Sequence, residues 1–341
     1  MDALYGKTLD ELKVIAADAG LPAFAAKQIA VWLYHSEVDS IDAMTNISKT
    51  GREKLAKQYT IGLTPNSGVQ ESTDGTKKYL FSYGIRRTIE AAYIPDEGRS
   101  TLCVSSQVGC KMGCLFCMTG KQGFQAHLTS NEILNQIRSL PEKSILTNVV
   151  YMGMGEPFDN LENVLKSSEI LTASWGYGWS PKRITVSTIG IIPAMEEFLN
   201  KSQCHLAVSL HTPFEEERRQ LMPVNHVYPL HEVIQTIKKH DWTHQRRVSF
   251  EYIMFKGVND DARHINELSR ILHGLKCRVN LIRFHPIPDS PLTSSSENTI
   301  QEFKEKLNAK GILTTIRASR GQDIDAACGL LSTKELLRKE S

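Results

Sequence analysis

The sequence predicts an α/β fold in which a small N-terminal helical domain and a short β-hairpin linker precede a partial barrel of six β/α units. From about residue 100 onward, apolar runs of strand length alternate with stretches that have the apolar spacing of helices. This alternation is typical of a parallel sheet with helices on its outside. Six units are fewer than the eight of a closed barrel, so we expect the barrel to be open.

The helical domain is expected over residues 1–60. Its first helix is predicted by Thr8-Leu-Asp-Glu11, which has the pattern of a capping box and is followed by apolar residues at helical spacing. Similar patterns predict two more helices, at Ala23–Tyr34 and Ser48–Gln58. The exposed side of the third helix carries several lysines and an arginine, so the domain is expected to present a basic surface.

The linker is expected over residues 61–95. Asp74-Gly75 separates two polar, strand-like runs, which is a signal for a β-hairpin. Residues Lys78–Tyr83 and Arg87–Tyr93 then alternate between polar and apolar side chains, as antiparallel strands do. The linker is therefore predicted to consist of antiparallel strands.

The barrel core is expected over residues 96–322, and a C-terminal segment over 323–341. Its strands are predicted at Thr101–Gln107, Asn148–Gly153, Arg183–Thr188, His205–Leu210, Val248–Met254 and Val279–Phe284. The helices between them are predicted at Ser130–Leu140, Leu161–Thr172, Pro193–Asn200, Leu230–His240 and Asp261–Leu275. In such folds the chemistry gathers at the carboxyl ends of the strands.

Composition places the chain among ordinary globular proteins, with 41% hydrophobic and 23% charged residues among 341. No stretch approaches the roughly 18 apolar residues of a membrane span, and the first residues do not form a signal peptide, so we expect a cytoplasmic protein. The net charge of +2 is below that of a strongly basic nucleic-acid-binding protein. Local pairs such as Arg86-Arg87 and Lys182-Arg183 remain candidates for phosphate contacts.

Three cysteines, Cys110, Cys114 and Cys117, form a C-x3-C-x2-C run after the first predicted strand. A structural zinc site takes four protein ligands, whereas a four-iron cluster held by three cysteines leaves one iron open to a substrate. The alternative is a zinc site that a distant residue such as His127 or Cys103 completes. The sequence favours the cluster, because no second C-x2-C pair is present.

Further polar motifs follow the other predicted strands. Gly153-Met-Gly-Glu-Pro157 follows the second strand, Ser187-Thr-Ile-Gly190 ends the third, Ser209-Leu-His211 ends the fourth, and Asn280 lies in the sixth. Each motif alone is weak, because glycines and serines are common at strand ends. Their shared position at one edge of the predicted sheet is the stronger argument for a binding site.

Two cysteines outside the run also bear on function. Cys103 lies on the first predicted strand, where a buried, structural cysteine is the ordinary interpretation. Cys328 lies in Asp323-Ile-Asp-Ala-Ala-Cys-Gly329, where small neighbours leave little mass around the sulfur. We therefore expect the Cys328 thiol to be open to a ligand.

These features resemble the radical S-adenosylmethionine (SAM) superfamily. Within it, the chain is similar to the bacterial dual-specificity enzymes that methylate C2 of adenine in 23S ribosomal RNA and transfer RNA. The motifs that carry this resemblance are Cys103-Val-Ser-Ser-Gln-Val-Gly-Cys110, Tyr151-Met-Gly-Met-Gly-Glu-Pro157, Thr185-Val-Ser-Thr-Ile-Gly-Ile191, Ser209-Leu-His211, Leu221-Met-Pro223, Lys256-Gly-Val-Asn259 and Asp323-Ile-Asp-Ala-Ala-Cys-Gly329.

The resemblance implies a role for each matching residue. Cys110, Cys114 and Cys117 would hold a [4Fe-4S] cluster, and Cys328 would carry the methyl group. Cys103 would form a transient disulfide with Cys328, and Glu90 would accept a proton. The residues expected to contact SAM are Gly155, Glu156, Ser187, Ser209, Leu210, His211 and Asn280.

The resemblance also implies the chemistry and the partners. Adenine C2 has no lone pair with which to displace the SAM methyl group, whereas a thiolate does. Cys328 would take a methyl group from one SAM, and a radical derived from a second SAM would activate it for addition to C2. The expected substrates are 23S rRNA and tRNA, the expected electron donor is a flavodoxin or a ferredoxin, and the chain is expected to be a monomer.

Three alternatives remain open at this point. An enzyme of the same build that methylates C8 of a ribosomal adenine would have the same arrangement of cysteines. A zinc-stapled RNA-binding module and a ferredoxin-like electron carrier are the alternatives from other classes. Metal analysis separates the zinc module from the enzymes, and the identity of the methylated nucleoside separates C2 from C8.

Overall fold

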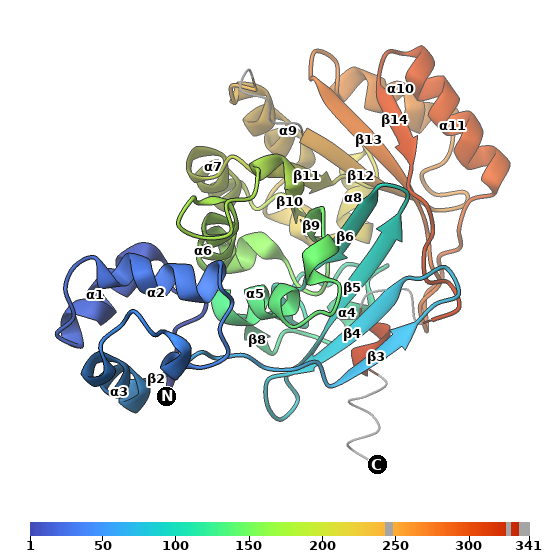
Figure 1. Cartoon of the computed structure of the whole chain (residues 1–341). Coiled ribbons are helices and arrows are strands. Elements are labelled where there is room, and N and C mark those ends of the chain that lie inside the picture. Colours follow the sequence, from blue (N-terminus) through green and yellow to red (C-terminus); the bar gives the residue numbers. More distant parts are fainter. Residues whose placement is uncertain (243–247, 325–328, 334–341) are drawn as a thin grey trace.

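The computed structural model describes residues 1–242, 248–324 and 329–333. Across these residues, one open sheet of ten strands has β14 and β3 at its edges (Figure 1). The strands from β6 to β14 in this sheet run parallel to one another. They are β6 (Arg99–Cys103), β9 (Asn148–Tyr151), β10 (Ile184–Thr188), β11 (His205–Ser209), β12 (Val248–Met254), β13 (Cys277–Arg283) and β14 (Leu313–Ile316).

The parallel strands confirm the predicted β/α series and its order. Strand β12 has the predicted bounds, and most of the others differ by one to three residues at an end. The first strand was predicted to continue to Gln107, but β6 ends at Cys103. Gln107–Val108 instead forms β7, which pairs antiparallel with β8 (Ala126–His127) and closes the loop that carries the three cysteines.

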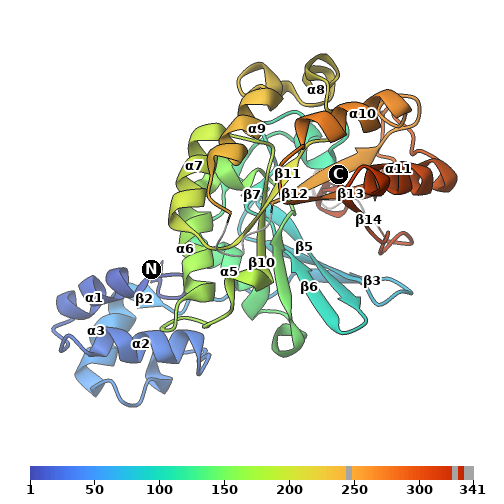
Figure 2. The same cartoon turned by 90° about the horizontal axis from the view of Figure 1, so that it is seen from above.

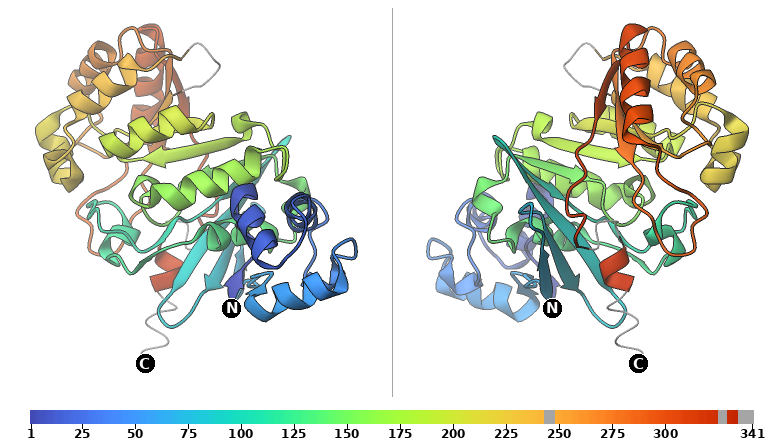
Figure 3. Two further views of the ribbon diagram at one scale, coloured as in Figure 1. Left: turned by 90° about the vertical axis from the view of Figure 1, so that its left-hand side faces the viewer. Right: turned by 90° about the vertical axis from the view of Figure 1, so that its right-hand side faces the viewer.

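Helices cover one face of the sheet, as predicted for a β/α series (Figure 3). The helices α5 and α6, α6 and α7, α7 and α9, and α10 and α11 are neighbours. Their bounds are α5 (Ser130–Arg138), α6 (Leu161–Thr172), α7 (Ile192–Lys201), α9 (Leu230–Lys239), α10 (Ala262–Ile271) and α11 (Glu297–Ala309). Two shorter helices, α4 (Met118–Lys121) and α8 (Glu215–Leu221), lie in loops and were not predicted.

The predicted linker is part of the same sheet. Strands β3 (Gly68–Glu71), β4 (Lys77–Ser82) and β5 (Thr88–Asp96) are antiparallel, and β5 pairs with β6 (Figure 2). The predicted hairpin at Asp74-Gly75 is confirmed, with Gly75 in the left-handed region at φ +81°. Because β6 hydrogen-bonds to β5 on one side and β9 on the other, these strands extend the barrel sheet without a break.

The N-terminal domain packs beside α5 and α6 (Figure 1). The side-chain amide of Asn131, in α5, donates to the carbonyl oxygens of Tyr5 and Gly62, both at 3.0 Å. The hydroxyls of Tyr5 and Tyr177 lie 2.6 Å apart. The domain consists of β1 (Asp2–Ala3), α1 (Leu9–Asp18), α2 (Ala25–Tyr34), α3 (Lys49–Gln58) and β2 (Tyr59–Thr60).

In the described part of the chain, the helices are too short and too polar to cross a lipid bilayer.

We predict that Asn131→Ala weakens the attachment of the N-terminal domain. The change removes two hydrogen bonds and leaves two carbonyl oxygens without their donor, so the free energy of unfolding should fall by about 1–3 kcal/mol. Urea denaturation measures this loss. Lys13→Ala, at an exposed position on α1, is the control, and an Asn131→Ala protein as stable as this control would contradict the prediction.

Candidate active site

The concave side of the sheet encloses a cavity of about 730 Å³. Strands β5, β6 and β9 contribute alternate residues to its wall, as the two-residue repeat of a strand requires. Thr101 and Cys103 of β6 lie on one side of this cavity, and Glu251 and Asn280 of β12 and β13 lie on the other. The fold therefore brings the predicted site residues Cys103 and Asn280 to one space. Ser187, on the neighbouring β10, is not among the residues that line it.

The three clustered cysteines lie in the loop between β7 and β8. The loop is closed at its base, where Gly109 has a φ of +71° and a Cβ atom would lie 1.7 Å from the carbonyl oxygen of Gly123. Only glycine fits this close approach. Cys110 and Cys114 are buried and Cys117 is partly buried, so one compact loop holds all three sulfurs.

The donor set of this loop fits an iron–sulfur centre. Burial raises the pKa of the Cys110 thiol to about 12, with a further contribution from Cys117, and burial holds the pKa of Cys114 well above its ordinary range. A bound cation reverses this cost, because thiolates are its ligands. Three cysteine sulfurs are a donor set that suits iron–sulfur ligation.

A single bound metal ion would need several ligand side chains directed at one point. Among the described residues, no group of three or more His, Cys, Asp or Glu side chains is arranged to hold one metal ion. In a four-iron cluster each thiolate binds a different iron. The three sulfurs of such a site therefore need not converge on a single point.

The glycine-rich motif after β9 lies against the base of the cysteine loop. Gly155 has a φ of +94°, and a Cβ atom there would lie 2.4 Å from Cβ of Gln107. The buried Glu156 carboxylate accepts from the amides of Phe158 at 3.0 Å and Ile189 at 3.1 Å. Burial raises the pKa of Glu156 to about 7, although these donors oppose the shift. Glu156 thus ties the end of β9 to the end of β10.

The motif Ser209-Leu-His211 ends β11. The amide of Leu210 donates to the carbonyl of Glu251 at 3.0 Å, and His211 has a φ of +58°. Nδ1 of His211 accepts from the amide of Ile253 at 3.1 Å, and its ring meets the ring of Phe116, in the cysteine loop, with centroids 4.8 Å apart. Burial, helped by Arg218, lowers the pKa of His211 to about 3, so the imidazole is neutral.

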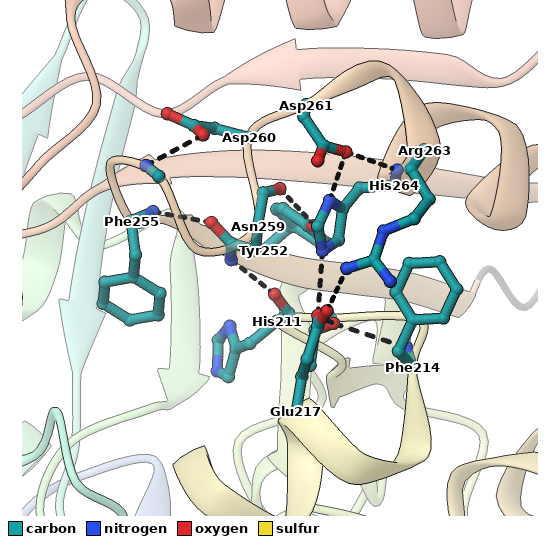
Figure 4. A network of polar contacts seen from close by, with 12 residues as sticks. His211, Phe214, Glu217, Tyr252, Phe255, Asn259, Asp260, Asp261, Arg263 and His264 are labelled. Carbon is teal, nitrogen blue, oxygen red and sulfur yellow. Dashed lines mark hydrogen bonds and ion pairs between the residues drawn. The ribbon is translucent and has the colours of Figure 1, made fainter.

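A polar network holds His211 in this backbone conformation (Figure 4). The Asn259 amide donates to the His211 carbonyl at 2.6 Å, and its oxygen accepts from the amide of Phe255 at 2.7 Å. Beside it, the side chains of Glu217 and His264 lie 2.8 Å apart. The sequence shows the motif that ends in Asn259, but it does not show the contact between Asn259 and His211, because a contact between two loops leaves no local pattern.

Asn280 lies in a row of side chains that crosses the sheet. Ser209, Glu251, Asn280 and Thr315 are consecutive neighbours on β11 to β14. The Asn280 amide donates to Oε1 of Glu251 at 2.8 Å and accepts from the Thr315 hydroxyl at 2.8 Å. Oε2 of Glu251 is buried and has no hydrogen-bond partner among the described residues, and burial raises the pKa of this group. Glu251 is an acidic residue in the mostly apolar strand β12, and this unusual position is the sequence signal that could have marked it as a site residue.

Glu90 is buried on β5 and accepts several hydrogen bonds. Lys78 lies 2.7 Å away as a buried ion pair, and the amides of Gly329 and Ser332 donate at 3.1 and 2.7 Å. Ala92 lies two residues further along β5 and pairs with Cys103 of β6. Because alternate side chains of a strand point the same way, Glu90 and Ala92 lie on one face of the sheet. The sequence shows Lys77-Lys78 as a local basic pair, but it does not show Lys78 as the partner of Glu90.

Cys328 lies outside the described residues, but the next residue, Gly329, is well surrounded. A Cβ atom at Gly329 would lie 2.9 Å from the amide nitrogen of Thr119 in α4, which begins directly after Cys117. The side-chain amide of Gln122 donates to the Gly329 carbonyl at 2.8 Å. Gly329 thus lies between Glu90 and the helix that follows the cysteine run.

Comparison with known proteins agrees with this geometry. Residues 104–268 match the model of the radical SAM superfamily, and residues 3–61 match that of the ribosomal RNA large subunit methyltransferase N-terminal domain. The crystal structure of a radical SAM methyltransferase from Sphaerobacter thermophilus superimposes with a TM-score of 0.89 at 40% identity, covering 96% of this chain and 98% of that one.

Curated relatives cover nearly the whole chain. The probable dual-specificity RNA methyltransferase RlmN of Parabacteroides distasonis is 58% identical, over 97% of this chain and 96% of the relative. The dual-specificity RNA methyltransferase RlmN of Syntrophus aciditrophicus is 42% identical, over 97% of both chains. The chain therefore belongs to the RlmN family of dual-specificity RNA methyltransferases, within the radical SAM superfamily.

Proposed function

We propose that this chain methylates C2 of an adenine in 23S rRNA and in tRNA, with SAM as the methyl donor. The observation that carries the proposal is the position of Glu90. Its side chain lies on the same face of β5 as Ala92, which pairs with Cys103. It also accepts a hydrogen bond from the amide of Gly329, the residue after Cys328. The dual-specificity name of the relatives favours C2 over the alternative C8 chemistry.

Membership of the radical SAM superfamily implies a [4Fe-4S] cluster and SAM. Cys110, Cys114 and Cys117 would hold the cluster, which when bound supplies the electron for radical formation from SAM. The closed loop between β7 and β8 keeps two of these sulfurs buried. His211 contributes a neutral ring against Phe116, so it adds no positive charge to this wall of the site.

Residues at the carboxyl ends of the strands would position SAM. Glu156 already accepts two backbone hydrogen bonds, but a carboxylate has about four lone-pair sites and can also accept from an ammonium group. Gly155, also a proposed contact, lets the backbone pass close to Gln107, which brings the end of β9 against the base of the cysteine loop. The other proposed contacts are Ser187, Ser209, Leu210, His211 and Asn280.

Cys328 would carry the methyl group to the base, and Glu90 would accept the proton from adenine C2. Lys78 balances the charge of the buried Glu90 carboxylate. Cys103 would then attack the Cys328 sulfur. A sulfur–sulfur bond forms as the bond from sulfur to the RNA-linked carbon breaks, and that carbon takes the electron pair and a proton.

The RNA would enter through the cavity, because an adenine must leave its stack to reach the thiol. Arg99, Lys182 and Arg278 line this cavity and are proposed to contact phosphate. Two basic residues named from the sequence have other partners: Arg87 pairs with Glu132 at 2.9 Å, and Arg183 stacks on Trp179.

Several further points extend the family assignment and remain proposals. A flavodoxin or a ferredoxin would supply the electron, and the chain would act as a monomer in the cytoplasm. Residues 1–60 would form an RNA-binding domain, 61–95 a linker, 96–322 the radical SAM core and 323–341 the segment that carries Cys328.

We predict that the chain produces 2-methyladenosine in both RNAs. It would be expressed in a bacterial strain that lacks this modification, and nucleosides from purified 23S rRNA and tRNA would be identified by mass spectrometry. A strain with the empty vector is the control. Finding 8-methyladenosine instead would support the C8 alternative, and no methylated adenosine above the control would overturn the proposed function.

We predict opposite effects for the two reactive cysteines. Cys328→Ala should abolish methylation, because the carrier thiol is lost. Cys103→Ala should trap a covalent protein–RNA adduct, visible on a denaturing gel, because release requires the second thiol. Cys277→Ala, at the start of β13, is the control and should behave as the wild type. Normal turnover by Cys103→Ala would refute its resolving role.

We predict that Glu156 makes the stability of the cluster-free protein depend on pH. Its pKa is about 7 in the folded state against 4.5 as the ordinary value, so folding favours the protonated form. This contribution is fully present below about pH 4.5 and is lost as the pH rises through about 7. Relative to Glu156→Gln, the wild type should lose on the order of 3 kcal/mol of unfolding free energy between these limits.

Chemical denaturation of the cluster-free wild type and Glu156→Gln at pH 5 and pH 8 tests this dependence. The exposed Glu305→Gln on α11 is the matched control and should keep the wild-type profile. If the wild type and Glu156→Gln change in parallel with pH, the raised pKa is wrong.

A further inference from the structure

The helix α8 contains a buried arginine with an unusual set of partners. Arg218 has 0% of its surface exposed. Its guanidinium donates to the side-chain oxygen of Asn225 at 2.6 Å and to the carbonyls of Ile189 and Ser209 at 2.7 and 3.0 Å. A fourth, longer contact reaches the carbonyl of Leu210 at 3.4 Å. All of these acceptors are neutral.

A guanidinium in such a place needs a negative charge nearby. Burial lowers the pKa of Arg218 to about 10, which still leaves it protonated at neutral pH. A buried charge without an opposite charge is costly, even when its hydrogen bonds are satisfied. Within the described residues, Arg218 forms no ion pair with a carboxylate. The Glu215 carboxylate is reached only through Asn225, whose amide donates to it at 2.6 Å.

The cysteine loop is where that negative charge would lie. The amide of Leu115 donates to the carbonyl of Leu221, at the end of α8, at 2.9 Å. Cys114, Leu221 and Ile189 pack in one apolar cluster, so α8 lies directly against this loop. The Arg218 guanidinium donates to the carbonyl of Ile189, which belongs to the same cluster as Cys114, so the positive charge lies beside the wall that Cys114 helps to form.

The charge of Arg218 also acts on the other side of the site. It contributes, after burial, to the low pKa of His211, whose ring packs on Phe116 between Cys114 and Cys117. The same guanidinium holds the carbonyls of Ser209 and Leu210 at the end of β11. One buried cation therefore faces both the cysteine loop and a strand end proposed to bind SAM.

We propose that Arg218 is the buried counter-cation of the iron–sulfur cluster and makes the cluster easier to reduce. The inference rests on the proposed function, in that Cys110, Cys114 and Cys117 hold the cluster. Reduction adds one electron from an external donor, with no proton, so the negative charge of the thiolate-bound centre grows by one unit. A fixed positive charge in a low-dielectric setting stabilises the reduced state more than the oxidised state.

Arg218→Gln and Arg218→Lys form a matched pair for the test. Both lose the planar fork of donors, but only the glutamine loses the positive charge. The midpoint potential of the cluster-loaded, full-length protein would be measured by redox titration followed by electron paramagnetic resonance. We expect a more negative potential in Arg218→Gln and a potential near that of the wild type in Arg218→Lys.

The control is Arg219→Gln, which removes a charge from the partly exposed neighbour that pairs with Glu216 at 2.6 Å. This variant should keep the wild-type potential. Asn225→Asp offers a second route that leaves Arg218 in place, because it puts a carboxylate on the guanidinium. This variant should also shift the midpoint potential to more negative values. If the Arg218 variants fail to load the cluster, Asn225→Asp tests the effect of the Arg218 charge on the potential.

Equal potentials in the wild type, Arg218→Gln and Asn225→Asp would overturn this role of Arg218. A purified wild type that binds no iron and sulfide would overturn the proposed ligand set instead. The two failures are therefore distinguishable.

Discussion

The common direction of the parallel strands is the constraint on which the rest of the structure depends. Because β6 and β9 to β13 all run the same way, the loops that follow them meet at one edge of the sheet. The cysteine loop, Gly155, Glu156 and His211 are thereby brought together from distant parts of the chain. The antiparallel strand β5 adds Glu90 on the other side of β6.

Around this edge, buried charges and polar groups are balanced by local partners. Lys78 pairs with Glu90, Asn280 donates to Glu251, and α8, which carries Arg218, lies against the cysteine loop. In a low dielectric such contacts are strong and a missing partner is costly, so they fix the positions of the side chains before a ligand arrives. The one buried carboxylate oxygen of this set without a partner among the described residues is Oε2 of Glu251, a residue that lines the cavity.

The order of the strands and most of the helices could be predicted from the sequence, because their apolar patterns are regular. The helix α8 could not, since Glu215–Leu221 is mostly charged and has no apolar stripe. The cysteine run and the strand-end motifs were visible as patterns. The contacts that Lys78, Asn259 and Arg218 make were not, because contacts between strands and loops depend on register and packing that spacing along the chain does not encode.

We propose that the C-terminal segment brings Cys328 to Cys103, with Glu90 as the anchor of the residues that follow Cys328. A disulfide requires Cα atoms within about 7 Å, so its formation reports on this proximity directly. The measurement is mass-spectrometric peptide mapping of the full chain after mild oxidation. The account predicts that Cys103–Cys328 is the main disulfide. Oxidation that leaves Cys328 as a thiol, or joins it to another cysteine, would contradict the account.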